Sequence, residues 1–307
     1  MKKIILPIIC LFVNIISQSQ IPKVSNGKIV HIDSFKSKYV TNRNIDIWLP
    51  SGYTKEKKYA VLYMHDGQML FDSNITWNKQ EWGVDETVSR LISNKKIKEC
   101  IVVGVWNGGK TRHTDYFPQK PFESLTIEQK NKIYTATRSN SNNVFSNEKI
   151  QSDNYLNFLI KELKPFVDSA FSTYKNRKNT FIAGSSMGGL ISIYAICEYP
   201  KIFGGAACLS THWPGIFTLE NNPIPDAFYN YLEQHLPKAK THKIYFDYGT
   251  ATLDTMYSPL QKKVDVIMQS KGYSVQNWAT KVFEGADHSE KSWQKRLDTP
   301  LKFLLHQ

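Results

Sequence analysis

Hydrophobic residues follow two repeating patterns along the chain, and together these patterns predict an ordered series of strands and helices. Residues 59–64 and 100–106 are almost continuously apolar, which is typical of strands buried on both faces of a sheet. Residues 44–49 instead alternate between polar and apolar side chains, as a strand with one exposed face does. Strands are predicted at 28–32, 39–49, 59–64, 100–106, 181–183, 204–209, 243–248 and 274–283.

Between many of these strands the apolar positions recur every three to four residues, which is the period of an amphipathic helix. Helices are predicted at 82–92, 150–171, 190–199, 224–236, 255–269 and 290–305. The later strands alternate with helices, and this order predicts an α/β fold. We expect one mostly parallel, eight-stranded sheet with an antiparallel start and helices on both faces. A length of 307 residues suits a single large domain, to which we assign residues 20–307.

Residues 107–150 are the least regular part of this pattern. They show no sustained period and end in a polar run of Ser and Asn at 139–147. A connection of this length in a compact domain is usually functional. The segment is therefore predicted to be a substrate loop or lid.

The N-terminus has a different character from the rest of the chain. Two lysines are followed by an apolar run at 4–16 and by small polar residues at 17–20, the pattern of a signal peptide with cleavage after Ser19. A membrane span needs about 20 apolar residues, and Asn14 interrupts a run that is already shorter. We therefore expect residues 1–19 to direct export to the periplasm or the exterior, without stable membrane insertion.

Composition narrows the class of protein only a little. Hydrophobic residues make up 41% of the chain and charged residues 21%, as in ordinary globular proteins. The formal net charge of +12 favours anionic substrates, acidic polysaccharides or cell-envelope surfaces, although it is also consistent with a basic surface that only keeps the protein soluble. No basic stripe interleaved with aromatic residues is present, so nucleic-acid binding is not predicted. The sequence leaves the oligomeric state open.

Three cysteines follow the predicted signal peptide, each in an apolar context: Cys100, Cys197 and Cys208. An odd number without regular spacing is not a disulfide framework. We expect small buried core residues, and a bridge between Cys197 and Cys208 stays open.

The most informative stretch begins where the apolar residues 181–183 run into Gly-Ser-Ser-Met-Gly-Gly at 184–189. A helical pattern follows, so Gly-x-Ser-x-Gly lies on a strand–turn–helix with Ser186 at its centre. This context is typical of a nucleophile elbow, in which a strained turn exposes the serine hydroxyl. Glycines flank Ser186 because the strand and helix backbones lie close together there. The alternative is a Gly/Ser loop that only turns the chain.

A nucleophilic serine needs a base within hydrogen-bond reach and a carboxylate that orients the base. On an elbow fold the acid and then the histidine follow the serine along the chain. His288 comes directly after the last predicted strand and is the candidate base. Asp254, in the loop after the strand at 243–248, is the candidate acid, and it is also placed to cap the following helix. Asp247, within that strand, is the alternative acid.

Oxyanion-hole donors are predicted in two loops. The backbone N–H of Met187 follows the nucleophile, and Gln68, in the loop after the strand at 59–64, is the candidate for the second N–H. His65 in the same loop precedes the serine and is predicted to be structural or to line the pocket. His212, which follows the strand at 204–209, is also predicted to line the pocket. This chemistry needs neither a cofactor nor a metal, and none is predicted.

Four segments carry a family resemblance: Tyr-Met-His-Asp-Gly-Gln-Met-Leu-Phe-Asp at 63–72, Trp-Gly-Val-Asp at 82–85, the elbow at 184–190, and Asp-His-Ser at 287–289. The chain resembles the esterase D-type "putative esterase" family of the α/β-hydrolase superfamily. This family includes enterochelin esterase-like hydrolases and the feruloyl and acetylxylan esterases of carbohydrate esterase family one. The resemblance covers nearly all of the chain after the predicted signal peptide.

The resemblance implies an α/β-hydrolase fold with Ser186 as nucleophile, His288 as base and Asp254 as acid. It also implies that the loop at 112–118, with Arg112 and Tyr116, and the residue Trp213 shape the substrate pocket.

The predicted function is a secreted or periplasmic serine esterase that hydrolyses a carboxylic ester through a Ser-His-Asp triad and an acyl-enzyme. The expected partner is a small-molecule or saccharide ester, either an acylated saccharide or hydroxycinnamoyl ester or a siderophore-type ester. An acyltransferase, in which a sugar hydroxyl replaces water, is an alternative on the same fold. A non-catalytic binding protein is a further alternative, although such a protein has no need of all three triad residues.

Overall fold

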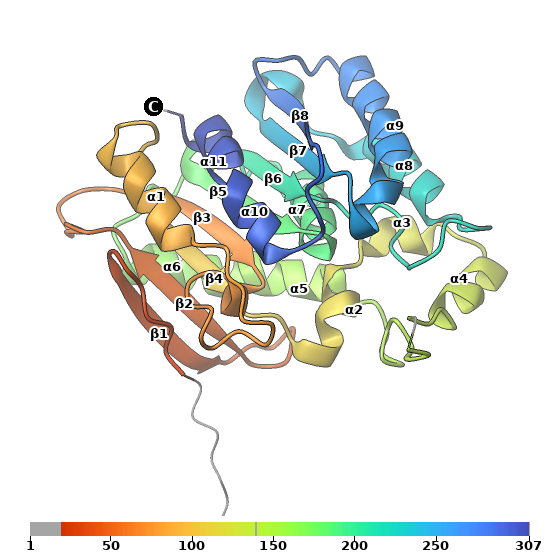
Figure 1. Ribbon diagram of the computed structural model, residues 1–307, viewed down its shortest axis with the longest axis horizontal. Coiled ribbons are helices and arrows are strands. Elements are labelled where there is room, and N and C mark those ends of the chain that lie inside the picture. Colours follow the sequence, from red (N-terminus) through yellow and green to blue (C-terminus); the bar gives the residue numbers. More distant parts are fainter. Residues whose placement is uncertain (1–19, 139, 307) are drawn as a thin grey trace, which may run out of the picture.

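Eight strands form one sheet that runs through the centre of the molecule (Figure 1). The structure, a computed structural model, describes residues 20–138 and 140–306, so the predicted signal peptide lies outside the described residues. The strands are β1 (Lys28–Phe35), β2 (Arg43–Leu49), β3 (Ala60–His65), β4 (Cys100–Val105), β5 (Thr180–Ser185), β6 (Gly205–Leu209), β7 (Lys243–Gly249) and β8 (Trp278–Phe283).

The strand order in the sheet is β1-β2-β4-β3-β5-β6-β7-β8. β2 runs antiparallel to both of its neighbours, and the strands from β4 to β8 are mutually parallel. The prediction of a mostly parallel sheet with an antiparallel start is therefore confirmed, as is the α/β-hydrolase fold. The central strands β3 to β6 are buried along their whole length, which explains why their sequences read as continuous apolar runs.

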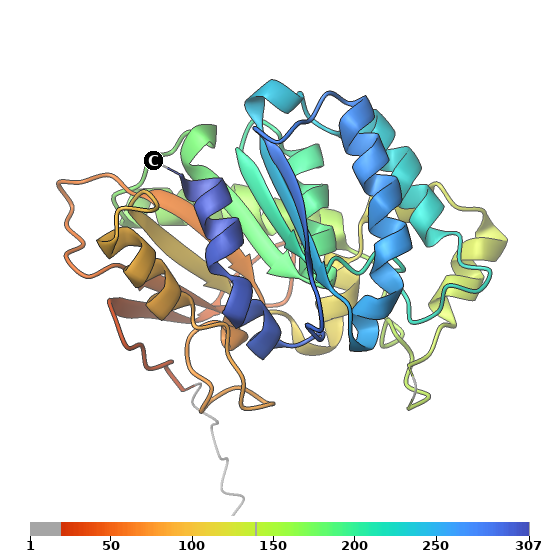
Figure 2. The ribbon, with the colours of Figure 1, turned by 45° about the horizontal axis from the view of Figure 1, so that its top comes forward.

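Helices cover both faces of the sheet (Figures 1 and 2). One face packs against α1 (Val84–Ser93), α10 (Glu290–Arg296) and α11 (Asp298–Leu305). The other face packs against α2 (Arg112–Tyr116), α5 (Ser152–Phe158), α6 (Lys164–Ala170), α7 (Met187–Glu198), α8 (Ile224–His235) and α9 (Tyr257–Ser270). Each face thus has its own apolar cluster, with the sheet between them.

The single helix predicted over 150–171 is interrupted. α5 passes into a π-helical turn at Leu159–Leu163 before α6 begins. Pro165 lies in the first turn of α6, and proline has no N–H to donate to the carbonyl of the preceding turn. A π-helical turn accommodates this missing hydrogen bond without ending the helical rod.

The predicted loop at 107–150 contains more regular structure than its sequence suggested, in the form of α2, α3 (Gln119–Glu123) and α4 (Ile127–Tyr134). Asp115 of α2 is fully buried and lies 3.2 Å from the guanidinium of Arg43 on β2. The same carboxylate accepts hydrogen bonds from Thr111 (3.0 Å) and Gln151 (2.8 Å). The start and end of this segment are therefore tied to one buried charge.

The parallel strands end at one edge of the sheet, so the loops that follow β3, β5, β6, β7 and β8 lie near each other there.

Every cysteine in the described residues is a buried free thiol, so no bridge joins Cys197 and Cys208. Across residues 20–138 and 140–306, we find no helix that is both long enough and apolar enough to span a membrane.

Candidate active site

Ser186 occupies the sharp turn between β5 and α7. Its backbone has φ 57° and ψ −120°, a conformation that non-glycine residues rarely adopt. The turn is held by hydrogen bonds from the Ser186 N–H to the Leu209 carbonyl (2.9 Å) and from the His212 N–H to the Ser186 carbonyl (3.2 Å). A Cβ at Gly184 would lie only 2.9 Å from the backbone of Gly188. The small residues of the motif are therefore required by the close approach of strand and helix.

His288, in the loop between β8 and α10, is hydrogen-bonded to Asp254. Its Nδ1 lies 2.5 Å from Asp254 Oδ1, and the Asp254 side chain is fully buried. Asp254 Oδ2 accepts two further hydrogen bonds, from the Ser210 hydroxyl (2.5 Å) and the Gly249 N–H (2.6 Å). Ser210 is itself held by donors from Trp293 (3.0 Å) and Arg296 (2.8 Å). The carboxylate is thus fixed on every side, which in turn orients the imidazole ring.

Electrostatics keep this carboxyl group ionised. Burial alone would raise the pKa of Asp254, but the hydrogen bonds from His288, Ser210 and Gly249 outweigh burial and hold the pKa below its usual value. At neutral pH the imidazole of His288 therefore faces a negative charge.

Asp247, the alternative acid, has other partners. Its Oδ1 lies 3.0 Å from the guanidinium of Arg296, and its Oδ2 accepts from the Tyr245 hydroxyl (3.1 Å). Burial raises the pKa of Asp247 to about 6, although Arg296 opposes this rise. Asp247 makes a buried ion pair below the site, whereas Asp254 contacts the histidine.

Ser186 and His288 line one cleft of about 610 Å³ at the carboxyl edge of the sheet. Met187, the first residue of α7, lines the same cleft, and the first N–H groups of a helix have no partner within the helix. Gln68 lines the cleft from the short 3₁₀ turn Gly67–Met69, and its side-chain Oε1 accepts from the Asn107 N–H (3.2 Å). Both expected oxyanion donors are thus residues of the cleft that holds the serine.

Arg112 and His212, two of the predicted substrate contacts, also line this cleft. Arg112 forms a two-pronged ion pair with Asp66, at 2.6 and 2.7 Å. Burial on its own would raise the pKa of Asp66, but the Arg112 charge and its hydrogen bonds lower the pKa below its usual value. Two of the five N–H donors of Arg112 are therefore used within the protein.

Tyr116 and Trp213, the other two predicted substrate contacts, lie in the core and are not among the residues that line the cleft. Tyr116 is fully buried, and its hydroxyl accepts from the Asp66 N–H (3.3 Å). Trp213 is 1% exposed and donates to Gln261 (2.9 Å). Both rings pack in the apolar cluster behind the site, where they support the cleft wall.

His65, which the sequence placed in the oxyanion loop as a structural or pocket-lining residue, is buried. Its Nδ1 is hydrogen-bonded to the Tyr155 hydroxyl (2.8 Å). Burial lowers the pKa of His65 to about 3, so the ring is neutral.

Sequence reasoning missed Tyr257, the first residue of α9. Its hydroxyl is hydrogen-bonded to His212 Nδ1 (2.8 Å) and interacts with the Ser186 side chain. Burial and the nearby charge of Asp254 raise the pKa of Tyr257 well above its usual value, so the phenol keeps its proton. Its position three residues after Asp254 was the only signal in the sequence, and no motif marks a tyrosine there.

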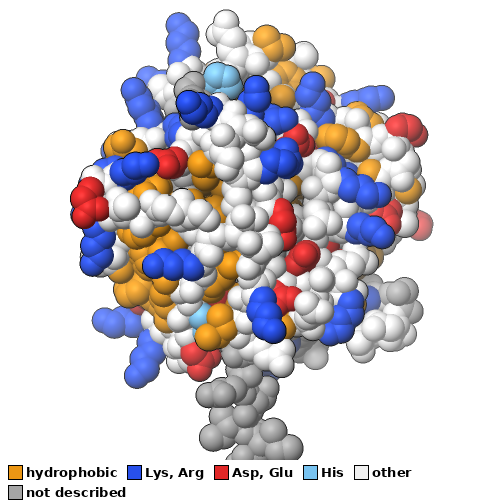
Figure 3. All heavy atoms as spheres, turned by 60° about the vertical axis from the view of Figure 1, so that its left-hand side comes forward, with side chains coloured by type: hydrophobic (Ala, Val, Ile, Leu, Met, Phe, Trp, Pro, Cys, Tyr) orange, Lys and Arg blue, Asp and Glu red, His pale blue; other side chains and the backbone are white. Residues whose placement is uncertain are grey.

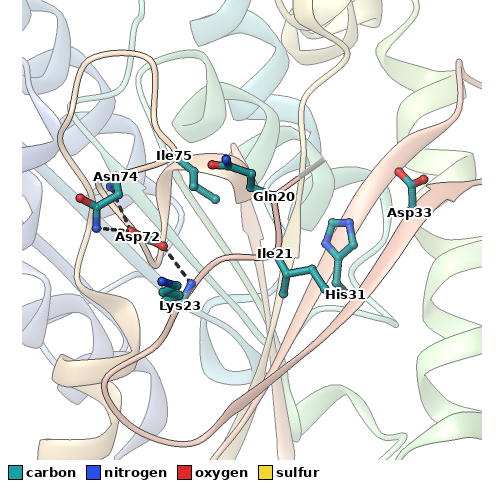
Figure 4. A pocket seen from close by; sticks show the side chains of 8 residues that line it. All are labelled: Gln20, Ile21, Lys23, His31, Asp33, Asp72, Asn74 and Ile75. Carbon is teal, nitrogen blue, oxygen red and sulfur yellow. Dashed lines mark hydrogen bonds between the residues drawn. The ribbon is translucent and has the colours of Figure 1, made fainter. Parts of the chain in front are cut away.

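A larger hollow of about 720 Å³ lies elsewhere, between the start of the described chain, β1 and the loop after β3 (Figure 4). Asp72 in this hollow accepts a hydrogen bond from the Lys23 N–H (2.9 Å). Serine, threonine and cysteine are absent from its described lining, so the described lining offers no hydroxyl or thiol nucleophile. Within residues 20–138 and 140–306, no group of three or more His, Cys, Asp or Glu side chains is arranged to hold a metal ion.

Comparison of this chain with known protein families identifies a family of esterases. The family model described as "Putative esterase" matches residues 37–304. Among curated relatives, the uncharacterized protein YjcH of Bacillus subtilis is 21% identical over 296 residues, which cover 91% of this chain and 98% of the relative.

Solved structures with the same fold include two esterases. The CE1 ferulic acid esterase of the anaerobic fungus Anaeromyces mucronatus is 20% identical, with a TM-score of 0.61 and coverage of 94% of this chain and 92% of that one. The enterobactin esterase FES of Shigella flexneri is 15% identical, with a TM-score of 0.62 and coverage of 92% of this chain and 60% of that one. At these identities the likeness concerns the fold.

Proposed function

This chain belongs to the "putative esterase" family, and from that premise we propose that it is a serine esterase that works through Ser186, His288 and Asp254. It is a carboxylic ester hydrolase of the α/β-hydrolase class. The observation that carries the proposal is the 2.5 Å hydrogen bond between His288 and the buried Asp254, made beside the cleft that also holds Ser186 on its strained turn.

In the proposed mechanism Ser186 Oγ attacks the ester carbonyl carbon while His288 Nε2 takes the hydroxyl proton. Asp254 holds Nδ1 of the same ring and stabilises the imidazolium that forms. The tetrahedral intermediate collapses as His288 returns the proton to the departing alcohol oxygen, which leaves an acyl group on Ser186. Water, deprotonated by His288, then attacks the acyl carbon. The bond from this carbon to Ser186 Oγ breaks, His288 returns the proton to Oγ, and the acid is released.

Negative charge develops on the carbonyl oxygen in both steps. We assign the N–H groups of Met187 and Gln68 to this oxygen, because both residues line the cleft next to Ser186. Loss of one such donor typically costs about 10²–10³ in rate.

For the substrate we propose an acylated saccharide or hydroxycinnamoyl ester, or a siderophore-type ester. The fold is shared with a ferulic acid esterase and an enterobactin esterase. The cleft wall also carries aromatic side chains suited to a planar acyl group, among them Trp77, which is 83% exposed, and Phe217. Residues 109–113, Arg138, Val144 and Ser146 contribute to the lining as well, so we retain 107–150 as the segment that shapes the substrate site. Export through the predicted signal peptide would place the enzyme where such esters occur outside the cytoplasm.

The mechanism is tested by hydrolysis of 4-nitrophenyl acetate. Ser186→Ala and His288→Ala should each lower kcat by at least about 10³-fold while the circular dichroism spectrum stays unchanged. Full activity in either variant would refute the mechanism. A panel of ethyl ferulate, acetylated xylan and enterobactin then ranks the substrate classes, and diversion of the acyl group to an added sugar would reveal transferase behaviour.

A further inference from the structure

The cleft contains one cation, Arg138, that is not balanced by a nearby carboxylate. Two other cations line the same cleft, and each is paired. Arg112 is held by Asp66 at 2.6 Å, and Lys110 lies 3.6 Å from Glu148. For Arg138 no ion pair occurs within residues 20–138 and 140–306, and the like charge of Arg112 acts on it.

The position of Arg138 is defined by a short turn rather than by a free loop. Its N–H donates to the Asn142 carbonyl, and its carbonyl accepts from the Ser141 N–H, both at 2.8 Å. A bridge between Thr137 and Asn143 closes the turn. The backbone of Arg138 is therefore held while its side chain faces the cleft.

The guanidinium of Arg138 lies over the first ring of an aromatic wall that leads to the nucleophile. Its central carbon is 4.9 Å from the centre of the Phe217 ring, and that ring is 5.3 Å from the ring of His212. His212 in turn is hydrogen-bonded to Tyr257, which contacts Ser186. A guanidinium that lies over a ring does not spend its N–H groups on the ring, so a planar anion can accept two of them.

The local electrostatics disfavour the unpaired charge. Partial burial and the charge of Arg112 lower the pKa of Arg138 from its usual value. Among the described lining residues, the other charged side chain outside these pairs is Glu290, whose carboxylate accepts from Asn78 (2.7 Å). An anionic ligand would therefore be attracted to the Arg138 side of the cleft and repelled from the Glu290 side.

Resting on the proposed esterase function, we propose that Arg138 and Phe217 form a subsite for a carboxylate on the substrate. The preferred substrate is then an ester whose acyl or alcohol part bears a carboxylate. The rings of Phe217 and His212 lie between this carboxylate and the scissile carbonyl. Phe217 supports the apolar portion between the ester and the charge, and Arg138 neutralises the charge. Neither residue takes part in the chemical steps, so the subsite acts on KM rather than on kcat.

The test compares matched neutral and anionic esters. For the acyl side the pair is 4-nitrophenyl hexanoate and mono-4-nitrophenyl adipate, and for the alcohol side it is phenyl acetate and 4-acetoxybenzoate. In Arg138→Met we expect KM for the anionic member of one pair to rise about fivefold, with KM for both neutral esters unchanged. Arg138→Lys should recover part of the loss, and Lys302→Met, which removes a cation outside the cleft that is paired with Asp298, should change KM by less than twofold. Equal KM changes for neutral and anionic esters, or no change for either anion, would overturn the subsite.

A second measurement separates the subsite from catalysis. Binding of monomethyl adipate and methyl hexanoate to the Ser186→Ala variant is measured by calorimetry, with and without Arg138→Met. The subsite requires tighter binding of the anion only when Arg138 is present, and weaker anion binding in 0.5 M salt. Equal affinity for the two esters contradicts the subsite even if the wild-type protein is an active esterase. Arg138-dependent anion binding without any hydrolysis contradicts the esterase mechanism but not the subsite.

Discussion

Asp254 and Asp247 are close in sequence but lie in different surroundings because β7 ends between them. Asp247 is still within the strand and faces Arg296, whereas Asp254 lies beyond it and reaches His288. Loop placement was therefore sufficient to favour Asp254 from sequence. The buried pair of Asp247 with Arg296 could not be foreseen, because the two residues are 49 positions apart.

Asparagine at these two positions should affect different properties. We expect Asp254→Asn to lower kcat by about 10³–10⁴-fold with little change in thermal stability, since the imidazole loses its charged partner. Asp247→Asn should keep kcat within about tenfold but lower the melting temperature, because Arg296 loses the nearer of its two buried carboxylate partners. Steady-state kinetics and thermal melts of both variants check this. A larger loss of kcat in Asp247→Asn would reverse the assignment of the acid.

Tyr257 is expected to position the serine and His212 without carrying charge in the reaction. Tyr257→Phe keeps the buried ring and removes only the hydroxyl, so kcat should fall about tenfold while KM and the melting temperature change little. Tyr229→Phe is the matched control. The Tyr229 hydroxyl donates to the Leu260 carbonyl (3.3 Å), and neither residue lines the cleft. Identical kinetics in the two variants would show that the Tyr257 hydroxyl has no role.

Whether an aromatic residue lines the cleft or lies in the core could not be predicted from the sequence. Tyr116 and Trp213 lie in segments that border the site, and a large ring there is compatible with either the cleft or the core. Only packing decides, and both rings are buried. Arg112 reaches the cleft, yet its pairing with Asp66 depends on a contact across 46 positions that no local pattern shows.

At the scale of elements, the nucleophile elbow depends on the distance between β5 and α7. Gly184→Ala would place a methyl group 2.9 Å from the Gly188 backbone, so we expect a loss of about 1–3 kcal/mol in unfolding free energy together with most of the activity. At Gly188 the nearest atom to an added methyl group is His65 Cβ at 3.4 Å, which is an ordinary contact. Gly188→Ala should therefore be the milder change in denaturant unfolding. Equal destabilisation by Gly184→Ala and Gly188→Ala would contradict the view that the close approach of β5 and α7 is the reason for the glycine at 184.

Element types were largely predictable, whereas interruptions and short helices were not. The apolar runs of the buried strands and the periods of α8 and α9 are strong local signals. The π-helical turn before Pro165 and the helices α2 to α4 have weak periods, and they are stabilised by contacts with distant residues. Asp115 with Arg43 is the clearest of these contacts.

At the scale of the whole molecule, acid stability should depend on the pair between Asp66 and Arg112. The pKa of Asp66 is lower in the folded protein than the ordinary value of 3.8. The stability that this carboxylate contributes is therefore fully present above pH 3.8, and it is lost as the pH falls through the lower folded-state value.

We expect Asp66→Asn to lower the melting temperature by a few degrees at pH 7, which corresponds to about 1–2 kcal/mol. The difference from wild type should shrink below pH 4. Thermal melts of both proteins from pH 7 to pH 3 check this, and a difference that stays constant over that range would contradict it.

The excess of basic residues is also a property of the whole molecule. Lys and Arg side chains are scattered over the face in Figure 3 rather than gathered in one stripe, in agreement with the formal net charge of +12. Such a field attracts anions in general. It does not select one, and selection therefore has to come from a defined position such as Arg138.

The central claim, that Ser186 receives the acyl group, is tested most directly by covalent labelling. A fluorophosphonate probe loses fluoride when an activated serine oxygen attacks phosphorus, and tandem mass spectrometry locates the label. We predict one phosphonylated residue, Ser186, with esterase activity lost in proportion to labelling, and no label in Ser186→Ala. A label on another residue, or esterase activity that survives complete labelling of Ser186, would contradict the account.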